Sequence, residues 1–184
     1  MDGDGTHIWI ETGLKELAKG GVDGVRVEVL AESLGITKGG FYRRFKDRRA
    51  LLDGMLETWA SGRIAAIEKQ MELGKATPAE RLKSVIKLFA ERANAQGMAV
   101  ELAVRQWARS DATAAEAVAG VDAARLKNVV KLFVMMGLPP PQAEARAVLV
   151  YAYIFGEGML FLDPSPRKRA SIAALCAEVI TDVG

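Results

Sequence analysis

The chain has 184 residues, of which 50% are hydrophobic and 26% are charged, and its formal net charge is +2. The high apolar content excludes a disordered protein, and the near balance of charges excludes both an acidic tail protein and a uniformly basic nucleic-acid coat. A chain of this length should bury roughly two-thirds of the surface that its unfolded form exposes, so its core needs no disulfide or metal.

One cysteine and one histidine limit the chemistry of the chain. Cys176 alone forms neither an intrachain disulfide nor a cysteine-based metal cluster, and it favours a reducing, cytoplasmic compartment. A catalytic triad or a multi-histidine metal site would have to use His7, which precedes the first predicted helix. We therefore expect no enzymatic activity, no cofactor and no metal.

No membrane segment is predicted. The chain starts with acidic and polar residues, so it lacks the basic region of a signal peptide. Its longest apolar stretch, residues 147–162, spans sixteen residues and includes Glu157, whereas a membrane span needs about 20 apolar residues. We expect this stretch to form a helix buried between other helices.

Apolar residues recur at helical spacing almost throughout the chain, and no strand pattern interrupts them. The first predicted helix has about 15 residues and ends at Gly20, Gly21 and Gly24. Short helices are predicted over residues 27–34 and 38–45, and Asp47 is expected to cap a long fourth helix.

Start signals divide the remaining chain. Thr77, Pro78 and Glu80 together predict a helix start, and Gly97 is expected to separate the helix that follows from another over residues 98–109. Three further helices are predicted: the first is capped by Ser110–Asp111 and reaches Met136, the second holds the apolar stretch, and the third starts at Asp163-Pro164-Ser165-Pro166. The predicted fold is therefore all-α with about nine helices.

Residues 26–49 combine a turn motif with a concentration of positive charge. Ala31 and Gly35 lie four residues apart, a spacing typical of a helix-turn-helix, whose second helix places its N-terminal residues against base edges in the major groove. Residues 38–49 contain six basic residues and one acid, a local net charge of +5. Such a local density of positive charge favours binding to the phosphates of nucleic acid, whatever the net charge of the whole chain.

The segment LAESLGITKGGFYRRFKDRRALL, residues 30–52, resembles the DNA-binding signature of the tetracycline-repressor (TetR) family. The resemblance covers about residues 8–60, and VRQWARSD at 104–111 more weakly resembles a motif in the family's ligand-binding domains. It implies a helix-turn-helix domain over residues 1–46 and a helical bundle for effector binding and dimerisation over residues 47–184. The implied protein is a bacterial, cytoplasmic, homodimeric repressor, released from a pseudo-palindromic operator by a small apolar or amphipathic effector.

The resemblance also implies which residues contact DNA. Thr37 is expected to cap the recognition helix, while Phe41 and Phe45 pack inward. Gly39 and Gly40 remove two side chains from the reading surface, so DNA shape and phosphate contacts should matter more than usual. The expected DNA contacts are Arg26, Thr37, Lys38, Gly39, Gly40, Tyr42, Arg43, Arg44, Lys46 and Arg48.

For the bundle, the resemblance implies a hollowed core and a dimer interface formed by the last two helices. The pocket candidates are Trp59, Arg63, Phe89, Leu102, Arg105, Gln106, Phe133, Tyr151 and Phe155. The interface candidates are Tyr151, Ile154, Gly158, Ile172, Leu175 and Val179. For each of them an ordinary core position is the alternative, and Glu101 with Arg105 either binds a polar effector group or forms an i,i+4 ion pair.

Two other functions stay open at this point. The first is a small helical ligand carrier or enzyme without DNA binding, and the second is a helix-turn-helix used only for protein contact.

Overall fold

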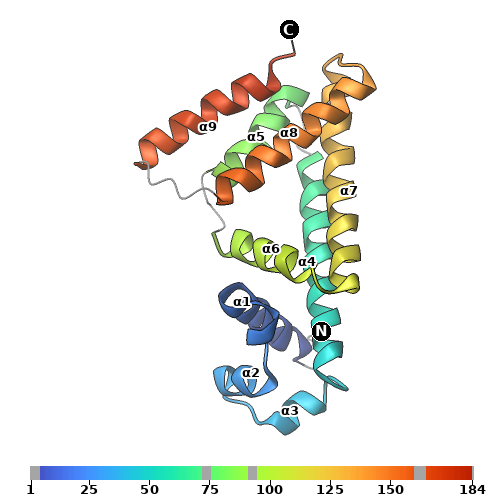
Figure 1. The fold of residues 1–184 in the computed structure, drawn as a ribbon, viewed down its shortest axis with the longest axis vertical. Helices are drawn as coiled ribbons and strands as arrows, with labels where there is room; N and C mark the ends of the chain where they lie inside the picture. Colours follow the sequence, from blue (N-terminus) through green and yellow to red (C-terminus); the bar gives the residue numbers. More distant parts are fainter. Residues whose placement is uncertain (1–4, 72–75, 91–94, 160–164, 184) are drawn as a thin grey trace. The chain divides into compact units, whose positions relative to one another are not determined.

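The computed structural model describes residues 5–71, 76–90, 95–159 and 165–183, and within these ranges it contains nine α-helices and no strand (Figure 1). In chain order the helices are α1 (Thr6–Gly24), α2 (Val27–Leu34), α3 (Lys38–Tyr42), α4 (Arg48–Met71), α5 (Pro78–Ala90), α6 (Ala95–Trp107), α7 (Ala112–Met135), α8 (Pro140–Met159) and α9 (Pro166–Thr181). The prediction of an all-α fold is confirmed.

The predicted helix starts form side-chain caps. The amide of Ala50 donates to Oδ1 of Asp47 (2.9 Å), and the amide of Ala114 donates to Oδ1 of Asp111 (2.9 Å). At α5, the amide of Thr77 donates to Glu80 (2.7 Å), and the amide of Glu80 donates to Oγ1 of Thr77 (3.2 Å). This reciprocal capping box satisfies two of the donors that a helix start leaves unpaired.

The last helix starts at Pro166, and the amide of Lys168 donates to Oγ of Ser165 (3.3 Å). The Asp163–Pro164 part of the predicted start signal lies outside the described residues.

Of three further predicted helix boundaries, one agrees with the structure and two differ. The end of the first helix agrees with the prediction, because the backbone of α1 is non-helical at Gly20 and Gly21 and the helix ends at Gly24. The third helix ends at Tyr42 rather than Phe45. Gly97 does not break a helix: it lies in the first turn of α6, where its carbonyl accepts from Nη2 of Arg63 (2.7 Å).

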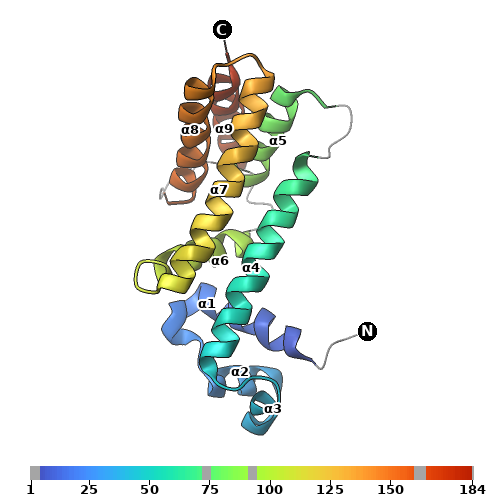
Figure 2. The ribbon, with the colours of Figure 1, turned by 90° about the vertical axis from the view of Figure 1, so that its right-hand side faces the viewer.

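The chain forms two compact units, residues 1–63 with 95–121 (unit 1) and residues 64–94 with 122–184 (unit 2). The long helices α4 and α7 each run without interruption through residues of both units (Figure 2). A domain boundary between residues 46 and 47 stays a prediction.

The core of unit 1 is built around aromatic side chains. Trp9 and Phe41 are fully buried and meet edge to face with ring centroids 5.4 Å apart, and Phe45 stacks on Phe41 at 5.2 Å. Such ring pairs add stability beyond the area that they bury. The expected inward packing of Phe41 and Phe45 is therefore present, and it fixes α3 against α1.

In unit 2, α5 packs against α9 and α8. Fully buried Leu82 and Ile86 of α5 lie in the same core as Val150 of α8 and the buried alanines Ala173 and Ala177 of α9. None of the helices in the described part of the chain is long and apolar enough to cross a membrane.

Candidate nucleic-acid interface

The turn between α2 and α3 requires glycine at its first position. Gly35 ends α2 with φ 64° and ψ 25°, a left-handed conformation that costs other residues energy. The amide of Ile36 then donates back to the carbonyl of Ala31 (2.9 Å), which closes the turn and lets α3 start at Lys38. Two short helices joined in this way form a helix-turn-helix.

Because Phe41 is buried against Trp9, the opposite face of α3 is exposed. Gly39, Tyr42 and Arg43 lie at positions i, i+3 and i+4 on that face, and all three are exposed. The Tyr42 side chain is 61% exposed, and its ring meets Phe41 edge to face at 5.1 Å. An exposed aromatic ring held by a buried one is placed to contact thymine methyls or a phosphate.

The basic residues near α3 differ in what they already bind. Arg43 and Lys46 are exposed and form no ion pair with a described residue. Nζ of Lys38 lies 2.7 Å from Oε1 of Glu28, and this hydrogen bond lowers the pKa of the Glu28 carboxyl. Both side chains are more than half exposed, so the pair is weak and exchange of Glu28 for a phosphate costs little.

The side chain of Arg48 forms hydrogen bonds with the backbone of unit 1. Its Nε donates to the carbonyl of Val25 (2.6 Å) and its Nη2 donates to the carbonyl of Val22. These bonds tie the start of α4 to the end of α1. Phosphate binding by Arg48 at the start of α4 stays a prediction.

Arg49 is likewise bound within unit 1. Its Nη1 lies 2.6 Å from Oδ2 of Asp111, its Nη2 donates to Oγ1 of Thr113 (2.6 Å), and its Nε lies 2.8 Å from Asp53. The pKa of Asp111 is lowered by the amide of Ala114 and by Arg49, and the pKa of Arg49 is raised chiefly by Asp111. Two of the six cations counted over residues 38–49 thus hold helices together.

The other predicted DNA contacts, Arg44, Thr37 and Arg26, differ in their hydrogen bonding and exposure. Nη1 of Arg44 donates to the carbonyl of Gly40 (3.0 Å), so this side chain folds back on α3. Thr37 occupies the N-cap position of α3, but its side chain forms no capping hydrogen bond; its carbonyl accepts from the amide of Gly40 instead (2.9 Å). Arg26 is exposed at the N-cap position of α2, where no side chain caps the helix.

Residues 10–55 match the family model of the bacterial regulatory proteins of the tetR family. Over this segment the chain is similar to the DNA-binding domain of the TetR family. The matched segment contains the whole helix-turn-helix, the exposed face of α3 and the arginines at the start of α4.

Solved structures resemble the chain over nearly its full length. A transcriptional regulator from Rhodococcus sp. Rha1 is 19% identical with a TM-score of 0.76, covering 95% of each chain. A transcriptional regulator of the TerR/AcrR family from Aquifex aeolicus VF5 is 16% identical with a TM-score of 0.69, covering 97% of this chain and 99% of its own. At these identities the likeness is one of fold. No curated protein matches the chain.

Two pocket candidates of unit 1, Arg63 and Arg105, pair with a buried carboxylate. Glu101 of α6 is almost fully buried; its Oε1 lies 3.0 Å from Nε of Arg105 and its Oε2 lies 3.2 Å from Nε of Arg63. Trp59 is also buried, and its Nε1 has no hydrogen-bond partner among the described residues. Leu102 is half-buried. Gln106 is exposed. The i,i+4 alternative for Glu101 and Arg105 is thus the one the structure contains.

Unit 2 contains a small cavity of about 10 Å³, room for about one water molecule. Its lining residues are Ile67, Gln70, Arg81, Val85, Asn128, Val129, Leu132 and Tyr151. Tyr151 is the only pocket candidate among them. Phe133 is fully buried in the core, and the side chain of Phe89 lies outside the described residues.

A buried arginine that the sequence did not predict lies behind Tyr151. Arg125 of α7 is 4% exposed; its guanidinium carbon lies 6.0 Å from the ring centroid of Tyr151 and 5.6 Å from that of Phe155, and its Nη1 lies 3.3 Å from Asp122. Cation–π contacts of this kind stabilise a desolvated guanidinium. Nothing in the spacing of the sequence separates this arginine from exposed ones.

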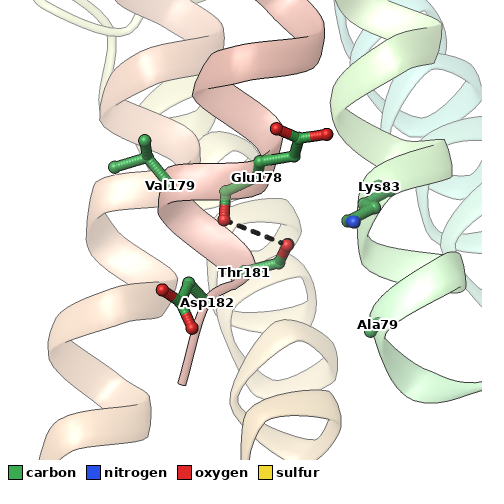
Figure 3. Close-up of a pocket in the computed structure, with 6 residues that line it drawn as sticks. All are labelled: Ala79, Lys83, Glu178, Val179, Thr181 and Asp182. Carbon is green, nitrogen blue, oxygen red and sulfur yellow. Dashed lines mark hydrogen bonds between the residues drawn. The ribbon is translucent and has the colours of Figure 1, made fainter. Parts of the chain in front are cut away.

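A larger cleft of about 420 Å³ opens at the surface of unit 2 (Figure 3). Lys83 and Ala79 of α5 form one wall, and the end of α9 forms the other. The α9 wall consists of Glu178, Val179, Thr181 and Asp182. Oγ1 of Thr181 donates to the carbonyls of Ala177 (2.8 Å) and Glu178 (3.4 Å), so the helix itself uses this hydroxyl.

The interface candidates on α9 are exposed, but those on α8 are not all exposed. Leu175 is 59% exposed and Val179 is 75% exposed, and Ile172 is exposed as well. Ile154 is instead buried in the core of unit 2, so we move it away from the interface. Tyr151 is half-buried and lines the cavity of unit 2, and its place in an interface stays a prediction. Gly158 lies in α8, but its surroundings are outside the described residues. Sequence reasoning missed the exposed apolar residues Val148, Leu149 and Met159 of α8.

Proposed function

We propose that the chain is a homodimeric transcriptional repressor that binds a pseudo-palindromic operator and is released by a small apolar or amphipathic effector. The observation that carries this proposal is the TetR-type helix-turn-helix, in which a buried aromatic core leaves Tyr42, Arg43 and Lys46 exposed together. A recognition helix presents such residues to the major groove, where cations neutralise phosphates and an aromatic ring contacts bases.

Dimerisation is supported by exposed apolar residues on the last two helices. Val148, Leu149 and Met159 of α8 and Ile172, Leu175 and Val179 of α9 are exposed although they are large and apolar. Such a surface is characteristic of a protein interface, and a second copy of the same chain supplies a matching one. Two recognition helices roughly 34–36 Å apart would then enter successive major grooves.

Effector binding is proposed for the cavity of unit 2, which α4, α5, α7 and α8 line together. Its wall combines apolar residues such as Val129 and Leu132 with the polar groups of Gln70, Asn128 and Tyr151, which suits an amphipathic ligand. The cavity holds about one water, so a ligand must bind a conformer in which it is larger. Preference for that conformer supplies the few kcal/mol needed to move the population off the operator.

The experiment that tests this function is selection of duplexes from a random pool, followed by footprinting. We expect an enriched sequence with two half-sites about one helical turn apart. Charge reversal in Arg43→Glu or Lys46→Glu should weaken binding steeply, because each change both removes a phosphate contact and adds repulsion. A pool from which no duplex is enriched would instead favour a helix-turn-helix used for protein contact.

A further inference from the structure

The two adjacent glycines of α3 have different surroundings. Neither has a positive φ, so the backbone does not require glycine at either position. A Cβ added at Gly40 would lie 2.5 Å from Cγ2 of Ile36, closer than real Cβ atoms approach their neighbours. Gly40 is therefore required by packing between α3 and the turn that precedes it.

Nothing within the described protein requires Gly39. It is exposed, and a Cβ added there would meet only Oγ1 of Thr37 at 3.7 Å, an ordinary van der Waals distance. Glycine nevertheless weakens a helix relative to alanine, because more backbone freedom is lost on folding. Glycine at position 39 therefore lowers the stability of the fold, and no contact within the described protein compensates for this loss.

We propose that Gly39 is glycine because DNA, not the fold, occupies the space of its missing side chain. Gly39 shares the exposed face with Tyr42 and Arg43, three and four residues further on. It also lies in the first turn of α3, the part of a recognition helix that approaches base edges most closely. Glycine is the residue used where a backbone must approach a ligand closely.

This inference rests on the DNA-binding function proposed above and adds a specificity-determining position to it. With a Cβ at Gly39, α3 must sit further from the groove floor, which weakens contacts to base edges more than contacts to phosphates. An added Cβ at Gly40 would face Ile36 instead, so packing accounts for glycine at that position, and a contact of its backbone with DNA stays a prediction.

The test compares three alanine variants: Gly39→Ala, Gly40→Ala and the matched control Gly120→Ala. Gly120 lies on α7, is exposed, and has no heavy atom within 4 Å of an added Cβ. Thermal midpoints are measured by circular dichroism. Dissociation constants are measured by fluorescence anisotropy on the duplex that the wild-type protein selects and on an unrelated duplex.

We expect Gly39→Ala and Gly120→Ala to raise the thermal midpoint by about 1–3 °C, and Gly40→Ala to lower it. Gly39→Ala should bind the selected duplex about tenfold more weakly, the cost of a mismatched base pair, while its binding to the unrelated duplex changes less than about twofold. Gly120→Ala should bind both duplexes as the wild type does.

Three results would overturn the inference: Gly39→Ala binds the selected duplex as well as the wild type, it loses affinity equally for both duplexes, or it lowers the thermal midpoint. A wild-type protein that selects no duplex would instead remove the proposed function, and with it the inference. The two failures are distinguished because the wild-type selection comes first and involves no variant.

Discussion

Replacement of Arg48 by alanine tests whether some basic residues of segment 38–49 stabilise the fold while others bind DNA. Arg48 donates from Nε and Nη2 to the carbonyls of Val25 and Val22, which joins the start of α4 to the end of α1. Arg43 lies five residues earlier, is exposed, and forms no ion pair with a described residue. The sequence alone makes the two arginines equivalent, but the structure does not.

The expected loss follows from the two hydrogen bonds. A hydrogen bond from a charged donor contributes about 1.5–3 kcal/mol when buried. Arg48 is only partly buried, so water can hydrogen-bond to the freed carbonyls in the variant. We therefore expect the loss of both hydrogen bonds to lower the free energy of unfolding by about 2 kcal/mol, rather than by twice the single value. For a chain of this size that lowers the melting temperature by about 4–8 °C. Arg43→Ala should change the free energy of unfolding by less than about 0.5 kcal/mol.

Urea denaturation followed by tryptophan fluorescence measures the free energy of unfolding, and anisotropy on the selected duplex measures DNA affinity. We expect Arg48→Ala to lower the urea midpoint. Without urea, at a temperature where the variant is folded, it should keep most of its DNA affinity. Arg43→Ala should show the reverse pattern. An unchanged urea midpoint for Arg48→Ala, or an equally large destabilisation by Arg43→Ala, would refute this division.

Two further predictions concern other parts of the chain. Asp111→Asn keeps an oxygen for the amide of Ala114 but loses the charge that faces Arg49. Since the pKa of Asp111 is lowered in the folded state, the stability that its charge contributes is present above the usual pKa of 3.8 and is lost as the pH falls below it. The urea midpoints of variant and wild type should therefore differ at pH 7 and converge under acidic conditions. A pH-independent difference would contradict this. Leu175→Glu and Val179→Glu should convert a dimer to monomers in sedimentation velocity, whereas Met135→Glu, an exposed apolar position on α7, should leave the dimer intact; equal behaviour of all three variants would argue against the α8/α9 face.

Local signals explain why so much of the fold was predictable from the sequence. The caps of Asp47, Thr77 and Asp111 each join residues three positions apart, so their geometry is contained in a few consecutive residues. The helix-turn-helix depends on the left-handed Gly35 and on the inward-facing Phe41, both of which belong to the signature itself. Sequence reasoning succeeds where the deciding contacts are this close along the chain.

The candidate site was less predictable, because its charges depend on partners far away in the sequence. Arg48 binds carbonyls 23 and 26 residues earlier, and Arg49 binds side chains 62 and 64 residues later. A count of charges over residues 38–49 records the cations but not these partners. The burial of Arg125 and of Ile154 likewise depends on how helices pack, since helical spacing alone leaves both an interior and an exterior position possible.

The salt dependence of DNA binding tests the central claim most directly. Each phosphate contact by a cation releases a condensed counterion, so the logarithm of the binding constant falls linearly with the logarithm of the salt concentration, with a slope of about −0.9 per contact. We expect a steep slope for the wild-type protein on its selected duplex, and a slope shallower by about one unit for Arg43→Ala and for Lys46→Ala. A flat salt dependence, or a slope that neither substitution changes, would contradict the assignment of this face to DNA.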